Sequence, residues 1–277
     1  MQTITLNNGV RMPVLGFGTF QTADDVCEVS VGAALAAGYR LIDTAQAYGN
    51  EAAVGRAIKR SGIPREDIFL TTKVNFTSYE DAHSAVCTSL ENLQVSYLDL
   101  VLLHWPFGNV YAAWRELEKL YDEKVIRAIG VSNFEPDRLV DLISYNRIRP
   151  AINQIETHLY CQRQQAHIWE DKYGVAHEAY APLGQGRAKE MFQEPDVLAL
   201  AQKYGKTAAQ ILLRFQLQNQ VVVIPKSTHE ARMRENIDVF DFRLTSEEMQ
   251  ALRLLDRRAP MIGTPEDPAK VEAALAW

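Results

Sequence analysis

Four side chains of this 277-residue chain have types and positions suited to acid–base chemistry, and each lies at or just after the end of an apolar run: Asp43, Tyr48, Lys73 and His104. A tyrosine with an ordinary pKa of about 10 is a poor proton donor at neutral pH. A neighbouring ammonium group lowers that pKa, and a carboxylate keeps the ammonium charged and in place. A histidine adds a hydrogen bond to a polar substrate atom. Together such groups form a tuned general acid beside an oxyanion donor, which reduction of a carbonyl group by hydride requires.

These side chains can act together only if the fold brings the ends of successive strands to one rim. Short apolar runs rich in Val, Ile and Leu predict eight buried strands, over residues 14–18, 40–43, 68–74, 98–105, 126–134, 151–156, 175–183 and 221–227. Helical patterns separate the runs, so the strands pair in parallel through right-handed crossovers. An open doubly wound sheet and a closed barrel both fit. Eight units in roughly 250 residues favour an α/β fold of the (β/α)8 TIM-barrel type, with its active site at the carboxyl ends of the strands.

The segments between the runs carry helix signals. Residues 77–93 place apolar side chains on one stripe, and Ser78 with Asp81 predicts a capping box. A helix is expected from Pro195 to Gly205, and a second one capped by Thr207. No Pro/Gly/Ser-rich linker interrupts the chain, so residues 1–277 are expected to form a single domain.

Composition excludes several classes of partner. The net charge is −6 with both signs scattered, which argues against nucleic acid. The start lacks a basic segment followed by an apolar one, and no apolar stretch reaches membrane-spanning length, so no signal peptide and no membrane partner are expected. The three cysteines, Cys27, Cys87 and Cys161, have no metal-site or disulfide spacing and suit a reducing, cytoplasmic location.

Each chemical assignment has a structural alternative. Asp43 alone could cap a turn, Lys73 could be solvated, Tyr48 could lie on the surface and His104 in the core; their joint position at one barrel rim favours a site. The Gly16-x-Gly18 pair is not a dinucleotide fingerprint, because position 21 is Gln instead of the Gly that GxGxxG requires.

The chain resembles the aldo-keto reductase superfamily from about residue 4 to about residue 256. The matching stretches are GFGTF, GYRLIDTAQAYGNE, TTKV, LDLVLLHWP, IRAIGVSNF, NQIE, YAPLGQG and IPKSTHEARMRENI. It is most similar to bacterial reductases of 2,5-diketo-gluconate, methylglyoxal and related aldehydes. The resemblance implies a barrel opened by an N-terminal β-hairpin, and the polar turn Asn7-Asn8-Gly9 suits that hairpin. It also implies a small carbonyl substrate, no need for a metal, and a monomer.

The resemblance further implies roles for individual residues. Tyr48 would be the general acid, tuned by Lys73 and Asp43, while His104 would orient the carbonyl. NADP(H) would be bound by Gly18, Thr19, Ser132, Asn133, Gln154, Tyr180, Leu183, Lys226, Ser227, Arg232, Glu235 and Asn236. Of these, Ser132, Asn133 and Gln154 would bind the carboxamide, and Tyr180 would stack on the nicotinamide ring or else be a core aromatic.

The last five of these residues would bind the adenosine end of the cofactor. Lys226, Ser227 and Arg232 would hold the 2′-phosphate through charge-assisted hydrogen bonds. Glu235 and Asn236 would contact the adenine. The alternative for this segment is the solvated start of an exposed helix.

An apolar pocket around the reacting carbonyl is expected from Phe20, Phe76 and Trp105, with core packing as the rival explanation. The chain departs from the family pattern at Asn75, Ala181 and His229.

Two other functions remain open. One is a non-catalytic NADP(H)-binding regulatory or structural protein on the same fold. The other is a barrel glycosidase using Asp43 and Glu156 as facing carboxylates, which would leave Tyr48 and Lys73 unexplained.

Overall fold

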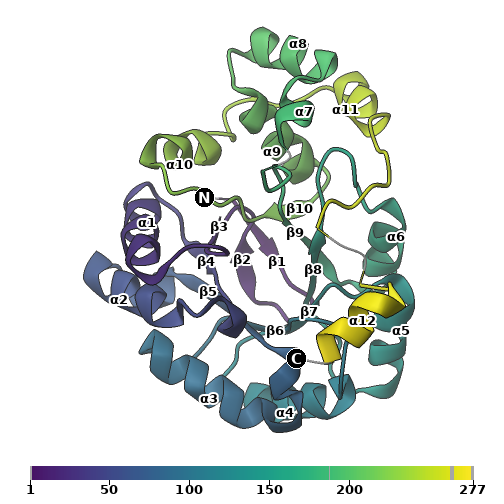
Figure 1. Cartoon of the computed structure of the whole chain (residues 1–277). Helices are drawn as coiled ribbons and strands as arrows, with labels where there is room; N and C mark the ends of the chain where they lie inside the picture. Colours follow the sequence, from purple (N-terminus) through teal and green to yellow (C-terminus); the bar gives the residue numbers. More distant parts are fainter. Residues whose placement is uncertain (1, 187, 263–264, 276–277) are drawn as a thin grey trace.

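A closed barrel of parallel strands forms the centre of the molecule (Figure 1). The computed structural model describes residues 2–186, 188–262 and 265–275. Eight parallel strands follow one another in chain order around the barrel: β3 (Phe17–Gly18), β4 (Leu41–Asp43), β5 (Phe69–Val74), β6 (Leu100–Leu103), β7 (Ile129–Ser132), β8 (Ile152–Glu156), β9 (Ala176–Tyr180) and β10 (Val221–Val223). Leu15, just before β3, bridges Val223 in parallel, and this contact closes the barrel. The predicted (β/α)8 fold and all eight predicted strands are confirmed.

The barrel strands divide their side chains between an inner and an outer core. Inner apolar residues include Leu41, Phe69, Leu100, Leu102, Ile152 and Val222. Outer ones, packed against the helices, include Ile42, Leu70, Val101, Val131, Ala179 and Val223. Successive strand residues point to opposite faces, so residues two or four positions beyond an inner one also point inward. Asp43, Lys73, Gln154 and Glu178 therefore continue the inner layer toward the carboxyl ends of the strands.

Helices surround the strands (Figure 1). Their bounds are α1 (Asp24–Ala36), α2 (Glu51–Ser61), α3 (Ala82–Leu93), α4 (Val110–Asp122), α5 (Pro136–Tyr145), α6 (Gln164–Tyr173), α7 (Ala188–Phe192), α8 (Pro195–Tyr204), α9 (Ala208–Gln218), α10 (Glu230–Ile237), α11 (Ser246–Arg253) and α12 (Pro268–Leu275). Short 3-10 helices form η1 (Gln46–Tyr48), η2 (Arg65–Asp67) and η3 (Phe76–Asp81).

The helix signals were correct in two places and wrong in one. α8 runs from Pro195 to the residue before Gly205, and Thr207 caps α9 in a full capping box. The capping box predicted at Ser78 is wrong, because the chain first makes the 3-10 turn η3. Asp81 then caps α3 by accepting a hydrogen bond from the backbone N–H of Ser84 at 3.3 Å.

The expected N-terminal hairpin pairs β1 (Thr3–Thr5) with β2 (Arg11–Pro13) in antiparallel register. Its turn includes Gly9 with φ +85°, a conformation that glycine adopts without strain. Leu6 and Met12 are buried in the inner core, so the hairpin closes one end of the barrel. It crosses the middle of the ring of strands in Figure 1.

The remaining sequence-level expectations concern membranes and thiols. Within residues 2–186, 188–262 and 265–275, no helix combines the length and apolar character that a membrane span needs. All three cysteines are free, and Cys27 and Cys161 are buried as small apolar fillers.

Candidate active site

The predicted catalytic side chains converge at the carboxyl ends of β4, β5 and β6. Lys73 Nζ lies 2.5 Å from Asp43 Oδ1 and donates to the backbone oxygen of Thr44 at 3.0 Å. The same ammonium lies 3.4 Å from the hydroxyl oxygen of Tyr48, which the short helix η1 carries over the barrel. Lys73 and Asp43 are fully buried. Removing an ion pair from water is costly unless further hydrogen bonds satisfy it, and those bonds are present here.

The net direction of the Tyr48 pKa differs from the sequence expectation. Burial raises the Tyr48 pKa above its usual value, and the attraction of Lys73 only partly opposes this effect. For Lys73, burial lowers the pKa, but Asp43 and Tyr48 outweigh burial and the net pKa is raised. The resting site therefore holds a protonated phenol beside a charged ammonium. Such a phenol still carries the proton that it would donate as an acid. The ammonium group then stabilises the phenolate that forms when the proton leaves.

His104 faces Tyr48 from the end of β6. The two rings meet edge to face with centroids 5.7 Å apart. Burial, with a smaller contribution from Lys73, lowers the His104 pKa to about 3, so the imidazole is neutral at physiological pH. Its Nδ1 is buried and has no hydrogen-bond partner among the described residues. A neutral imidazole has one N–H donor, which suits a carbonyl oxygen held next to Tyr48.

The four residues expected to bind the nicotinamide also lie together. Ser132 Oγ donates to the backbone oxygen of Gln154 at 2.8 Å, and Tyr180 donates to Asn133 Oδ1 at 2.8 Å. Asn133 has φ +64°, a left-handed conformation that Asn tolerates better than most residues. This turn directs its amide back to the carbonyl oxygen of His104 at 3.0 Å.

Gln154 joins this group to the catalytic set, a link that the sequence analysis did not predict. Its Nε2 donates to Asp43 Oδ2 at 2.8 Å and to Glu178 Oε2 at 2.9 Å. Glu178 is fully buried in the inner layer of the barrel. Burial, then Asp43, raises the Glu178 pKa to about 8. The signal was present in the sequence, because Glu178 stands two residues before Tyr180 in the same strand and must face the same way.

Aromatic rings line the approach to Tyr48. Phe20 packs against Tyr48 at 4.9 Å, and with 43% of its surface exposed it is not a core residue. Trp105 stacks between His104 and Phe107, at 5.9 and 5.5 Å. Phe76 meets Phe107 edge to face at 5.9 Å and also packs on the outer core. Phe107 was absent from the predicted pocket, although it follows the HWP stretch directly.

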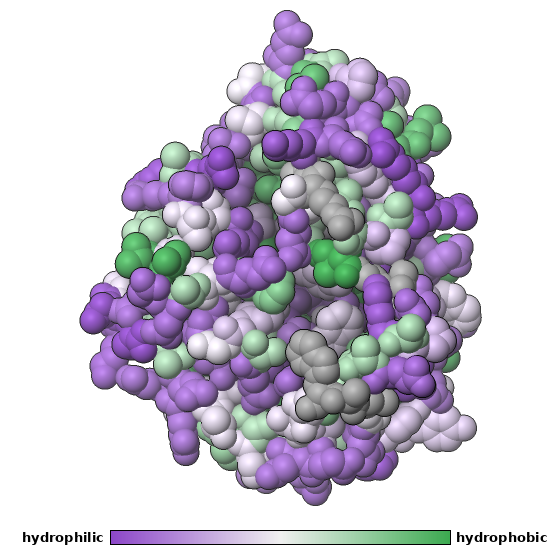
Figure 2. Space-filling view, in the orientation of Figure 1, coloured by the Kyte–Doolittle hydropathy of each residue, from purple (hydrophilic) through white to green (hydrophobic). Residues whose placement is uncertain are grey.

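A cavity of about 510 Å³, a size typical of small-molecule sites, opens beside this aromatic wall. Its lining includes Phe107, Asn133, Glu135, Arg138, Glu266 and Val271. The last residue belongs to α12, which lies on the face seen in Figure 1. Figure 2 shows that this face is largely hydrophilic, with a recess near its middle. Trp277, for which the sequence leaves open folding over the site or docking on the barrel, lies outside the described residues.

The expected phosphate-binding residues follow β10. Lys226 and Arg232 are exposed, and neither forms an ion pair with a described residue. Ser227 is buried and accepts a hydrogen bond from the His229 backbone N–H at 3.0 Å, which shapes the turn into α10. Both cations are therefore available for a phosphate group.

The other expected cofactor residues have structural contacts of their own. Thr19 donates its hydroxyl to the Asp43 carbonyl at 3.0 Å. A Cβ on Gly18 would lie 3.0 Å from the backbone oxygen of Ile224, so this position leaves little room for a side chain. Glu235 accepts from Thr207, Asn236 is buried, and Leu183 packs between two apolar clusters.

Glu156, the second carboxylate that a glycosidase would need, is engaged elsewhere. It accepts hydrogen bonds from the backbone N–H groups of Met261 and Ile262, the latter at 3.0 Å, and from His158 Nε2 at 3.0 Å. Asp43 is equally engaged, by Lys73 and Gln154. Glu156 therefore anchors the C-terminal segment, and the pair does not present two free carboxylates across a site.

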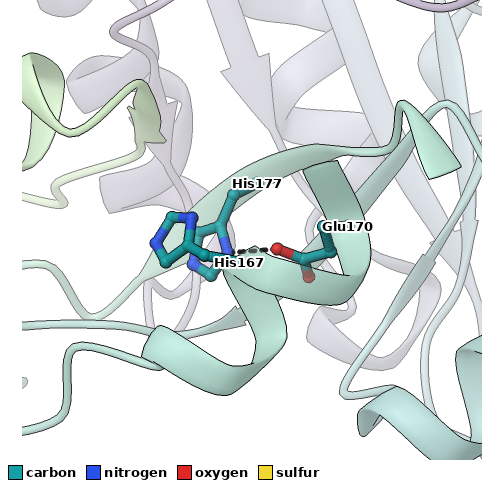
Figure 3. Close-up of side chains that lie close together, drawn as sticks. All are labelled: His167, Glu170 and His177. Carbon is teal, nitrogen blue, oxygen red and sulfur yellow. Dashed lines mark hydrogen bonds and ion pairs between the residues drawn. The ribbon is translucent and has the colours of Figure 1, made fainter. Parts of the chain in front are cut away.

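A second polar cluster lies on the outer side of β9, where α6 covers it: His167, Glu170 and His177 (Figure 3). The nitrogen atoms of His177 contact Glu170 Oε2 at 2.6 Å and Thr157 Oγ1 at 2.7 Å. The two imidazole rings are stacked 4.0 Å apart and only 14° from parallel, so their lone pairs do not converge on one point. This arrangement fits a hydrogen-bonded core better than a set of metal ligands.

Comparisons with known proteins agree with this geometry. Residues 14–257 match the Aldo/keto reductase family. The methylglyoxal reductase DkgA of Yersinia pestis is 43% identical over 256 residues, which cover 91% of this chain and 92% of that protein. The crystal structure of MGS-M4, an aldo-keto reductase enzyme from a deep-sea metagenome library of the Medee basin, superposes with a TM-score of 0.94 at 42% identity, covering 95% and 98% of the two chains. The Bombyx mori aldo-keto reductase in complex with NADP has a TM-score of 0.89 at 32% identity, covering 95% of each chain.

Proposed function

Because the chain belongs to the aldo-keto reductase family and is an oxidoreductase, we propose that it reduces small aldehydes, ketones and dicarbonyls with NADPH. The observation that carries this proposal is the buried Asp43–Lys73 pair beneath the Tyr48 hydroxyl, with Lys73 Nζ 3.4 Å from that oxygen. Burying such a charged pair is costly, and its place beside the Tyr48 hydroxyl is where a proton donor needs a neighbouring ammonium.

His104, Tyr48 and Lys73 would have different roles in the reaction. His104, as a neutral donor, and the Tyr48 hydroxyl would both hydrogen-bond the substrate carbonyl oxygen. When bound, NADPH would supply the hydride that reaches the carbonyl carbon. Tyr48 would pass its proton to the oxygen as negative charge develops there, and Lys73 would stabilise the resulting phenolate until solvent restores the proton.

Two features support the choice of cofactor. The side-chain oxygens of Asn133 and Gln154 are held in place by the bonds that their amide nitrogens donate, and they could accept the N–H groups of a carboxamide. The exposed cations Lys226 and Arg232 suit a 2′-phosphate, which NADH lacks. The Bombyx mori relative was solved with NADP, and the Yersinia pestis relative is named for methylglyoxal, so a small dicarbonyl is the first substrate to test.

Turnover with methylglyoxal, followed by the absorbance of reduced nicotinamide, tests this proposal. We expect oxidation of NADPH at a much higher kcat/KM than NADH. Tight NADPH binding without turnover on any aldehyde or dicarbonyl would favour the non-catalytic alternative. Equal use of NADH would contradict the assignment of Lys226 and Arg232.

A further inference from the structure

Glu178 lies beneath the proposed nicotinamide site, and it forms no ion pair with any described residue. It stands on β9 opposite Gln154 of β8 and Val222 of β10. One carboxyl oxygen accepts from Gln154 Nε2 at 2.9 Å, while the other, Oε1, is buried and has no partner among the described residues. Within the same residues, Lys73 forms its ion pair with Asp43 and none with Glu178.

The charges around Glu178 do not balance if both carboxyl groups are ionised. The ionisable groups acting on it are Asp43 from β4 and Lys73 from β5, with Tyr48 of η1 above them; β8 and β10 contribute the neutral Gln154 and Val222. One ammonium cannot neutralise two carboxylates. A buried carboxylate without a counter-ion is costly, and such a group keeps its proton instead.

Glu178 also determines which atom Gln154 presents to a ligand. Both hydrogens on Gln154 Nε2 are used, one on Asp43 Oδ2 and one on Glu178 Oε2. The amide orientation is therefore set from below by the two carboxyl groups. Its Oε1 remains as an acceptor for an N–H of the nicotinamide carboxamide.

We propose that Glu178 is a positioning residue that keeps a proton in the free and NADPH-bound enzyme and releases it to solvent when NADP⁺ binds. The oxidised nicotinamide ring carries a positive charge and the reduced ring is neutral. A cation held close to Gln154 in a low-dielectric interior supplies the counter-charge that Glu178 lacks. NADP⁺ binding thus releases one proton and strengthens as the pH rises, whereas NADPH binding does not. This inference rests on the proposed use of NADP(H).

The ratio of the two dissociation constants, Kd(NADP⁺)/Kd(NADPH), measured by quenching of tryptophan fluorescence across neutral pH, tests the proposal. Titration of the 2′-phosphate affects both nucleotides and cancels in this ratio. In the wild type the ratio should fall as the pH rises, by up to about tenfold per pH unit. In Glu178→Gln, which mimics the protonated acid, the ratio should be independent of pH. In a weakly buffered solution with a pH indicator, NADP⁺ should release one proton more from the wild type than from Glu178→Gln, because both proteins share any release from the 2′-phosphate.

Glu51→Gln is the matched control, because Glu51 is also a buried glutamate but lies on α2 and bonds the outward-facing Thr72. It should retain the wild-type pH dependence. A wild-type ratio that does not change with pH would overturn the inference while leaving the proposed function intact. If Tyr48→Phe removes the pH dependence and Glu178→Gln retains it, the proton belongs to Tyr48 and the inference is wrong. If NADPH does not bind the wild type at all, the proposed cofactor is wrong and the inference falls with it.

Discussion

His177 and Glu178 are neighbours on β9, yet they belong to two buried polar clusters of opposite character. His177 points outward, and both of its nitrogens are hydrogen-bonded: one to Glu170 (Figure 3) and the other to Thr157. Glu170 in turn uses both oxygens, since Oε1 accepts from Asn153 Nδ2 at 2.8 Å. Glu178 points inward, and one of its oxygens has no partner among the described residues. His177 and Glu170 therefore use all of their side-chain hydrogen-bonding atoms, whereas Glu178 does not.

This difference suggests that the outer cluster contributes to the stability of the fold and that the inner cluster contributes to the reaction. A fully hydrogen-bonded buried cluster stabilises one packing arrangement and costs free energy when a partner is removed. A buried group with unused hydrogen-bonding capacity costs stability, and it persists where a ligand or a reaction completes it. We therefore expect inner substitutions to reduce activity and outer ones to reduce stability.

The largest expected effect is on turnover at the inner cluster. Tyr48→Phe should lower kcat on the order of 10²–10⁴-fold, because the proposed proton donor is lost. NADPH affinity and the thermal midpoint should change little. Tyr39→Phe is the matched control for kcat, since Tyr39 is a buried tyrosine that donates to the Met233 carbonyl of α10, away from Asp43, Lys73 and His104. A Tyr48→Phe enzyme with most of its turnover would show that another group donates the proton.

At the outer cluster we expect a loss of stability without a loss of turnover. Glu170→Gln leaves one oxygen acceptor where Glu170 uses two, for His177 and Asn153 Nδ2, and should lower the free energy of unfolding by about 1–3 kcal/mol. Urea denaturation measures this change, and kcat measured on folded protein should be unaltered. If Glu170→Gln lowers kcat and leaves the free energy of unfolding unchanged, the proposed difference between the two clusters is wrong.

The dependence of stability on pH should identify Glu178. Its pKa in the folded protein is raised, so the unfolded chain ionises first, and the stability present in acid is lost as the pH rises toward 8. Over that range the free energy of unfolding of the wild type, relative to Glu178→Gln, should fall by up to about 1.4 kcal/mol per pH unit. Parallel curves for the two proteins would mean that Glu178 is ionised in the fold.

A smaller effect of opposite sign is expected at half-buried His167. Burial, with His177, lowers its pKa to about 3, so its stabilising contribution is present above pH 6.5 and lost as the solution is acidified. His167→Gln should weaken the loss of stability between pH 6.5 and 4, as measured by thermal unfolding. Because His104 contributes in the same direction, part of the acid sensitivity should remain. An unchanged acid profile would show that His167 does not titrate in this range.

The sequence was sufficient for the strands, the barrel and the positions of the four predicted catalytic residues, because these depend on local patterns. Eight apolar runs separated by helical segments leave few topologies, and parallel strands bring their carboxyl ends to one rim. Asp43, Lys73 and His104 were therefore placed at one rim from their positions alone. The helix cap at Asp81 was missed because a 3-10 turn and an α-helical turn differ by small changes in hydrogen bonding.

Contacts between residues far apart in the chain were determined only by the tertiary structure. These include Gln154 bridging Asp43 and Glu178, Glu156 holding the segment before α12, and Phe107 stacking on Trp105. The direction of the Tyr48 pKa was decided there too, because burial and the field of Lys73 act against each other and only packing sets their balance. Residue types and their spacing determined which groups could take part in the chemistry; distance and desolvation, which depend on the whole fold, determined their protonation states and their partners.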